Sequence, residues 1–194
     1  MRILLLAAAL AGLAACTTSR QAERRAVAAA DWRSVVTADD AKRLREWRGD
    51  FAAALKQARA AGHGAHIDAE GPLLQPDAAI PGPLANGDYR CRIIKVGAKS
   101  PGLLDYVAYP AFSCRVSQDG PVQYFAKLTG SQRPMGRIYP GDAMRSVFLG
   151  TLVLGDEARM MRYANDPDRD VAGWVERIGP AKWRIISPRR ASNR

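Results

Sequence analysis

Two short segments with the same alternating pattern constrain the fold of this chain most strongly. In each, an aromatic residue, a cysteine and an aliphatic residue occupy alternate positions, with polar residues between them: Tyr89-x-Cys91-x-Ile93 and Phe112-x-Cys114-x-Val116. Successive side chains of a β-strand point to opposite faces, so the pattern places both thiols on the apolar face of a sheet.

The rest of the chain after Gly87 has the same β character. Short alternating stretches are separated by Gly, Pro, Asn and Asp, and the expected strands are 88–96, 105–109, 111–117, 122–128, 137–139, 145–154, 171–178 and 182–187. So many short strands in about 100 residues are typical of a small antiparallel β barrel or sandwich. We therefore predict an antiparallel β domain over residues 88–194.

A helical segment is expected before this domain, over residues 31–66. Its main helix runs from Thr37, which can cap it, to Ala61, with apolar residues three or four positions apart: Leu44, Trp47, Phe51, Leu55 and Ala58. Gly62 is placed to end this helix. Residues 67–87 are rich in Pro and Gly and predict an extended connector that lies on the β domain. The fold class is α+β, and residues 31–194 form one structural unit.

The N-terminus has the features of a secretory signal. Arg2 precedes an apolar run, 3–13, that is too short to span a bilayer, and the run ends in Leu13-Ala14-Ala15-Cys16. This tetrad resembles the lipobox of bacterial lipoproteins. The resemblance implies that the signal peptide 1–15 is removed, that Cys16 is lipidated, and that residues 16–30 are a tether. By analogy with lipoprotein sorting, the absence of Asp after Cys16 favours the outer membrane, facing the periplasm. A plain signal peptide with a nearby cysteine is the alternative.

Export and the cysteine count together predict one disulfide. With Cys16 assigned to lipid, Cys91 and Cys114 remain as a single pair in an oxidising compartment. Closing a loop of about 24 residues with a disulfide stabilises a fold by roughly 3 kcal/mol. A redox-active pair is less favoured, because the spacing is not Cys-x-x-Cys.

The chain is basic, and its charge is spread out. The formal net charge is +10, with 29 Lys and Arg against 19 Asp and Glu distributed along the sequence. A nucleic-acid-binding protein usually concentrates its charge on one element, so we expect no nucleic-acid partner. A diffuse basic surface next to a membrane suits an anionic lipid, a glycan or an envelope protein. An Arg-rich composition without specific purpose is the alternative.

No metal or cofactor site is predicted. His63, His66 and nearby Glu70 match no helical zinc motif, and a loop at a helix terminus is the favoured interpretation. Asp166-x-Asp168-x-Asp170 starts like a calcium loop, but it lacks the glycine and glutamate that such a loop requires later, which favours a solvated turn.

The segment 127–136, between two expected strands, is the candidate ligand loop. Thr129, Ser131, Gln132 and Arg133 offer hydrogen-bond donors beside one guanidinium, which can bind a carboxylate or phosphate. The same side chains can instead satisfy the loop's own backbone. No catalytic residue is assigned, because no nucleophile elbow, phosphate loop or dinucleotide fingerprint occurs.

Six segments carry a resemblance to a known family: Asp31-Trp32-Arg33, Ala60-Ala61-Gly62-His63-Gly64, Glu70-Gly71-Pro72-Leu73-Leu74, Asp88-Tyr89-Arg90-Cys91-Arg92, Phe125-Ala126-Lys127-Leu128-Thr129-Gly130-Ser131-Gln132-Arg133-Pro134 and Val175-Glu176-Arg177-Ile178-Gly179-Pro180. The chain resembles an uncharacterised bacterial lipoprotein family, domain-of-unknown-function family 4893. The resemblance implies export and a single structural unit, and it supplies no catalytic residue, cofactor or substrate.

Three hypotheses for function follow. The first is a non-enzymatic lipid-anchored lipoprotein of the envelope that acts as a binding or structural module. The second is a periplasmic hydrolase or transferase that uses His63, His66 or the Ser131 loop. The third is a β barrel similar in architecture to small periplasmic protease inhibitors.

Overall fold

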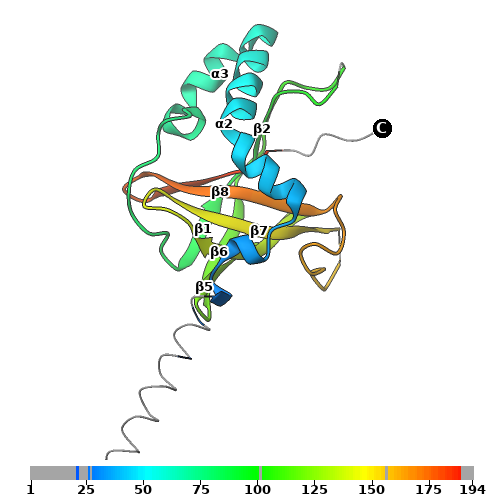
Figure 1. Ribbon diagram of the computed structural model, residues 1–194. Coiled ribbons are helices and arrows are strands. Elements are labelled where there is room, and N and C mark those ends of the chain that lie inside the picture. Colours follow the sequence, from blue (N-terminus) through cyan, green and yellow to red (C-terminus); the bar gives the residue numbers. More distant parts are fainter. Residues whose placement is uncertain (1–20, 22–25, 27, 101, 156, 189–194) are drawn as a thin grey trace, which may run out of the picture.

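The structure is a computed structural model that describes residues 21, 26, 28–100, 102–155 and 157–188 (Figure 1). Cys16 and the predicted signal peptide 1–15 lie outside the described residues. The helical elements are η1 (Trp32–Ser34), α2 (Ala38–Ala58), η2 (Arg59–His63), α3 (Gly64–Ala69) and η3 (Gly71–Leu74). The strands are β1 (Gly87–Cys91), β2 (Ile94–Val96), β3 (Tyr106–Ala108), β4 (Phe112–Asp119), β5 (Val122–Lys127), β6 (Gln132–Pro140), β7 (Arg145–Leu154), β8 (Asp170–Gly179) and β9 (Lys182–Ile186).

Helix α2 begins where the sequence predicts. The Thr37 side chain accepts a hydrogen bond from the Asp40 backbone N–H, which satisfies one of the helix's free donors. The apolar side chains at three- and four-residue spacing are buried on one face, with Leu44 and Ala58 almost fully inaccessible. Among the described residues no helix is long and apolar enough to cross a membrane.

The end of the helical segment differs from the expectation. Gly62 adopts a φ of 90°, which breaks the helix, but the chain then continues into α3 and η3. Helical structure therefore extends to Leu74 instead of stopping at Gly62. Pro72 favours this continuation, because it stands in the first turn of η3, where no backbone donor is needed.

The seven longer strands form one antiparallel sheet in the order β1-β4-β5-β6-β7-β8-β9. The sheet curls into a half-barrel, which confirms the expected antiparallel β architecture. Its edge strands β1 and β9 approach each other on the open side, where the Tyr89 and Trp183 rings meet edge to face at 5.8 Å. The connector after η3 crosses this side, and an isolated bridge joins Ile80 to Arg177 of β8.

The expected single strand 88–96 is two strands in two sheets. Gly87–Cys91 pairs with β4 in the large sheet, whereas Ile94–Val96 pairs only with β3 in a separate hairpin. The prediction was wrong because periodicity cannot show that the chain changes partner between Cys91 and Ile94. Sheet membership is decided by the non-local contacts of β2 with α2.

The predicted disulfide between Cys91 and Cys114 is present, with a Cα–Cα distance of 6.0 Å. Tyr89 stands opposite Cys114, and Cys91 stands opposite Phe112. Both cysteines are therefore on the same face of the sheet, as the alternating pattern predicts.

Two hydrophobic clusters lie on opposite faces of the half-barrel. On the outer face, helix α2 crosses β7 and β8 (Figure 1), and Leu44 packs with Val147 and Leu149. The Trp174 indole N–H donates to the Leu44 carbonyl at 2.8 Å, which fixes the helix on the strand. On the inner face, buried apolar residues pack beneath the connector: Ile138, Phe148 and Val175, with Leu84 and Phe125 beside them.

A buried carboxylate lies between α2 and the sheet. The Glu176 side chain is fully inaccessible and accepts hydrogen bonds from Arg145 at 2.6 Å and from Arg184 at 2.6 Å and 2.8 Å. Arg184 also donates to four backbone carbonyls of η3 and the connector, those of Pro72, Leu73, Gln75 and Pro76. One ion cluster thus joins the helical segment, the connector and the sheet.

Candidate functional site

One surface depression lies over the edge of the sheet at β1 and β4. It has a volume of about 470 Å³ and is lined by Asp88, Tyr89, Arg90, Phe112, Ser113, Cys114, Arg115 and Leu128. Residues directly opposite each other in antiparallel strands share a face, so Asp88 and Arg115 lie beside Arg90 and Ser113. The curl of the sheet carries this edge away from α2, which leaves the polar face exposed.

Two arginine side chains border this depression, and only one of them is paired with a carboxylate. Arg115 donates to both carboxylate oxygens of Asp88, at 2.6 Å and 3.3 Å, and this hydrogen bonding lowers the pKa of Asp88 and raises that of Arg115. Within the described part of the chain, the exposed Arg90 guanidinium makes no hydrogen bond or ion pair. Arg90 can therefore bind an anion without first breaking an internal contact.

The predicted ligand loop is shorter than expected and adjoins this depression. Only Leu128–Ser131 lies between β5 and β6, because Gln132 and Arg133 already belong to β6. Arg133 donates to the carbonyls of Gly130, Gly155 and Glu157.

Two further oxygen atoms of this turn accept hydrogen bonds from backbone. The Thr129 hydroxyl accepts from the Ser113 N–H at 3.1 Å, and the Ser131 carbonyl accepts from the Gly155 N–H at 2.8 Å. These contacts agree with the alternative expectation for this segment, in which its polar groups satisfy its own backbone. In the described part of the chain, the exposed Ser131 hydroxyl and Gln132 side-chain amide make no hydrogen bond, so they stay available to a ligand together with the polar groups of the adjoining strands.

Lys127 stabilises this turn through hydrogen bonds to its backbone. Its buried ammonium group donates to the carbonyls of Thr129 and Gln132, both at 2.8 Å, and lies 3.5 Å from the centre of the Phe112 ring. Burial lowers the pKa of Lys127, with a smaller contribution from the nearby charge of Arg133. The ammonium therefore orders one wall of the depression.

The two histidines lie elsewhere, in a cluster of three stacked rings. His63 and His66 each have ring centroids 5.6 Å from that of Tyr106 on β3, and the two imidazoles are 5.7 Å apart. The expected loop is instead the boundary of η2 and α3, since helical structure resumes after Gly62. Glu70 accepts a hydrogen bond from the Tyr106 hydroxyl at 3.1 Å and pairs with Arg92, so its carboxylate is already engaged.

The Asp166–Asp170 segment forms a turn before β8. Asp166 accepts from the Asp168 N–H at 3.1 Å and pairs with Arg169, while buried Asp170 accepts from the Ala164 N–H at 3.0 Å. In the described ranges no three His, Cys, Asp or Glu side chains are arranged to hold a metal ion. The structure thus places Asp168 at the surface and uses Asp170 to fix the preceding loop.

The second depression, of about 280 Å³, lies where the connector crosses the open side of the half-barrel. Arg177 and Trp183 contribute to its lining. Arg177 donates to three backbone carbonyls, those of Pro81, Gly179 and Pro180. Its guanidinium is therefore used to hold the connector.

The sequence profile of one family, described as a domain of unknown function (DUF4893), matches residues 32–193. The chain belongs to the DUF4893 family. No curated protein and no solved structure matches it significantly. The matched range covers α2, the connector and the whole half-barrel, so the DUF4893 domain includes both depressions.

The sequence pattern did not single out the residues that line this depression of the DUF4893 domain, and the ligand loop at Thr129, Ser131, Gln132 and Arg133 stays a prediction. Arg90, Ser113 and Arg115 are the polar positions that alternate with the apolar ones in β1 and β4. Their alternation identifies an exposed face, but the pairing of the two strands, which brings them together, is not readable from one sequence.

Proposed function

We propose that this DUF4893 protein is a lipid-anchored envelope lipoprotein whose β domain is a non-enzymatic module that binds an anionic group. Cys16 carries the lipid, and the domain lies at the periplasmic face of the outer membrane. The signal-like run and the Leu-Ala-Ala-Cys tetrad support the anchor. The Cys91–Cys114 disulfide supports export, because such bonds persist in oxidising compartments.

The observation that carries the binding proposal is the unoccupied guanidinium of Arg90 in the depression over β1 and β4. Phosphate and carboxylate groups match the planar donors of arginine. The neighbouring Arg115 adds positive charge, while its pairing with Asp88 keeps it in place. Lipid headgroups, acidic glycans and acidic segments of envelope proteins share this chemistry.

An enzymatic role has less support. Ser131 contacts the segment after β7 through its backbone, whereas His63 and His66 stack on Tyr106 of the small hairpin. A serine nucleophile needs an adjacent base, and these contacts place the candidate residues in different surroundings.

The test is a nuclear magnetic resonance titration with glycerol 1-phosphate, a soluble stand-in for an anionic headgroup. We expect shifts of the Arg90 side chain and of the backbone amides of Ser113 and Arg115. Arg90→Glu should abolish them, whereas Arg162→Glu, the same charge change on an exposed residue of another loop, should preserve them. Equal shifts in both variants would show nonspecific ion binding and contradict the proposal.

A further inference from the structure

The hairpin of β2 and β3 exposes two adjacent leucines at its tip. Leu103 is 52% exposed and Leu104 is 72% exposed, more than any other large apolar side chain in the described ranges. Figure 1 shows the hairpin beside α2, standing away from the large sheet. Adjacent exposed leucines have no role in the packing of the domain, so they indicate a contact surface.

The base of the hairpin is fixed to the body of the protein. Ile94, Val96 and Tyr106 pack against the cluster that contains Leu55 and Ala58 of α2.

The turn above this base lies close to the helix. A Cβ atom at Gly97 would stand 2.9 Å from the Cβ of Ala54, so only glycine allows the approach. The Gly97 N–H donates to the Asp105 carbonyl at 2.8 Å. The leucines are therefore carried on an anchored stem.

Cationic and aromatic side chains accompany the leucines. The Lys95 ammonium lies 5.2 Å from the centre of the Tyr109 ring, and Tyr109 is 37% exposed. Lys99 is exposed between the stem and the leucines. Exposed apolar side chains accompanied by lysine and aromatic side chains are typical of segments that enter the interface of an anionic membrane.

We propose that this hairpin is a second membrane contact, in which Leu103 and Leu104 enter the boundary between headgroups and acyl chains of an anionic bilayer. Lys95 and Lys99 then lie at the headgroups, and Tyr109 lies at the interface. The inference rests on the proposed lipid anchor only for bringing the bilayer within reach. A projecting tip can enter a fluid lipid layer, whereas a protein partner would need a matching pocket.

The experiment uses the full lipidated protein in vesicles of phosphatidylcholine with and without phosphatidylglycerol. Leu104→Cys is labelled with an environment-sensitive fluorophore. Met160→Cys, which replaces a 40%-exposed methionine in the loop before β8, is labelled in the same way and is the matched control. The native Cys91 and Cys114 are joined in a disulfide and do not react with the label. Intact mass measured on each sample shows whether the lipid is present.

We expect a blue shift and quenching by nitroxide-labelled lipid at position 104 but not at position 160, and both effects should be stronger with phosphatidylglycerol. Lys99→Glu should lower the ratio of membrane-inserted hairpin tips to hairpin tips in water about fivefold or more. If the fluorophore at position 104 of the lipidated protein keeps the emission that it has in water, the proposal is overturned. A blue shift that depends on protein concentration without vesicles would also overturn it, in favour of self-association. Loss of the lipid would contradict the anchor instead. The same labels on the unlipidated chain, with Cys16→Ser so that this thiol does not react, then test the hairpin.

Discussion

At the scale of single residues, the buried charges hold the parts of the molecule together. Glu176 is fully buried between Arg145 and Arg184, and Arg184 in turn lies against Phe51 of α2 with its cation 5.6 Å from the ring centre. An ion cluster of this kind contributes little net energy when complete, but removing one partner leaves uncompensated charge in a dry environment.

Glu176→Gln keeps the shape of the side chain and removes its charge. We expect the free energy of unfolding to fall by about 3–5 kcal/mol, because two guanidinium groups lose their counter-ion. Urea denaturation measures the change. Asp88→Asn is the matched control: it breaks an arginine pair that is exposed to water, so the midpoint should hardly move. Similar losses in both variants would contradict the role given to Glu176.

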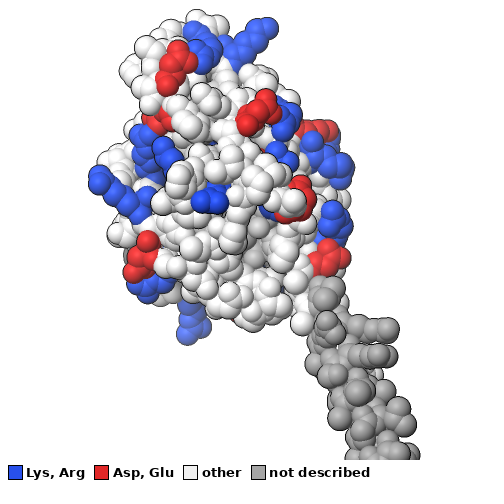
Figure 2. All heavy atoms as spheres, turned by 90° about the vertical axis from the view of Figure 1, so that its left-hand side faces the viewer, with Lys and Arg blue, Asp and Glu red and all other residues white. Residues whose placement is uncertain are grey.

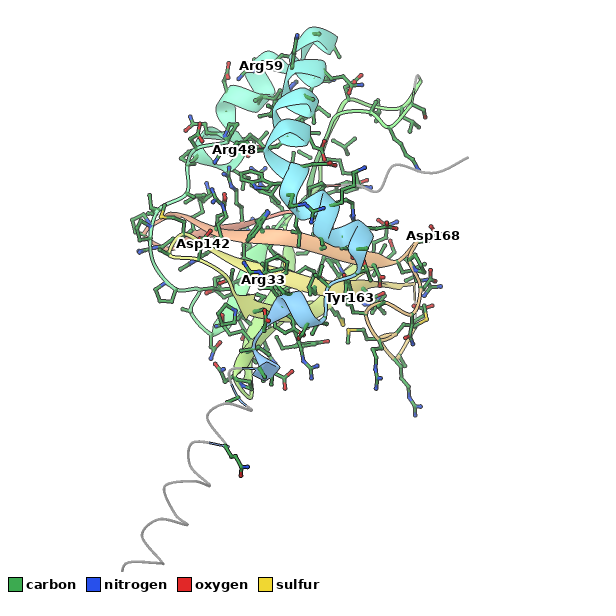
Figure 3. The ribbon with its side chains drawn as sticks, in the orientation of Figure 1. Arg33, Arg48, Arg59, Asp142, Tyr163 and Asp168 are labelled. Carbon is green, nitrogen blue, oxygen red and sulfur yellow. A yellow bond between two sulfur atoms is a disulfide. The ribbon has the colours of Figure 1, made fainter. Side chains whose placement is uncertain are left out.

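Tyr163 couples the start of α2 to the loop before β8. Figure 3 shows Tyr163 near the start of α2. Its hydroxyl donates to buried Asp40 at 2.5 Å and accepts from the Thr37 N–H at 3.2 Å. Burial and the hydrogen bond to Asp40 raise the pKa of Tyr163 above its usual value of about 10. The proton is therefore held more tightly in the folded state than in the unfolded one.

Tyr163→Phe should lower the free energy of unfolding by about 1–3 kcal/mol at neutral pH, because buried Asp40 loses a donor. The wild-type contribution is fully present below about pH 10 and is lost as the pH rises through the folded-state pKa. The difference between wild type and variant should therefore shrink above about pH 10. Tyr109→Phe removes an exposed hydroxyl and serves as the control. A difference that grew with pH would refute this assignment.

At the scale of elements, β6 and β7 approach each other more closely than side chains allow. Gly136 stands opposite Gly150, and a Cβ at Gly150 would lie 2.2 Å from the Met135 carbonyl oxygen and 2.6 Å from the Phe148 ring. Backbone atoms cannot yield to such a contact as the end of a flexible side chain can. The pair of glycines thus permits the curvature at the centre of the half-barrel.

Gly150→Ala should therefore destabilise the protein by about 1–3 kcal/mol or more. Gly49→Ala, in α2, meets nothing within 4 Å and should stabilise it by up to about 1 kcal/mol through helix propensity. Thermal unfolding of the two variants gives shifts of opposite sign. An unchanged melting temperature for Gly150→Ala would show that the strands can separate at no cost.

Local elements were predictable where one signal dominates. The Thr37 cap, the apolar spacing in α2 and the alternation around Cys91 and Cys114 act over a few residues and need no knowledge of distant partners. Elements decided by non-local packing were not predictable. Gly62 looks like a helix end, and only the burial of Ile67 and Leu74 against α2 shows why helical structure resumes after it.

At the scale of the whole molecule, charge pairing explains why the basic surface is not a single patch. Figure 2 shows basic and acidic side chains interspersed over one face, separated by broad areas without charge. Exposed arginines are paired in several places, among them Arg48 with Asp77 and Arg59 with Asp68. The sequence predicted a diffuse distribution, but which guanidinium groups remain unoccupied depends on strand register and could not be read from it.

Intact mass spectrometry of the protein extracted from its own membranes in mild detergent tests the lipid anchor and the disulfide together. We predict a chain that lacks residues 1–15, carries a lipid mass on Cys16, and has two hydrogens fewer because Cys91 and Cys114 are joined. A retained non-covalent anionic molecule that Arg90→Glu loses would extend the result to the binding site. A processed chain without lipid would contradict the anchor, and free thiols at Cys91 and Cys114 would contradict the disulfide.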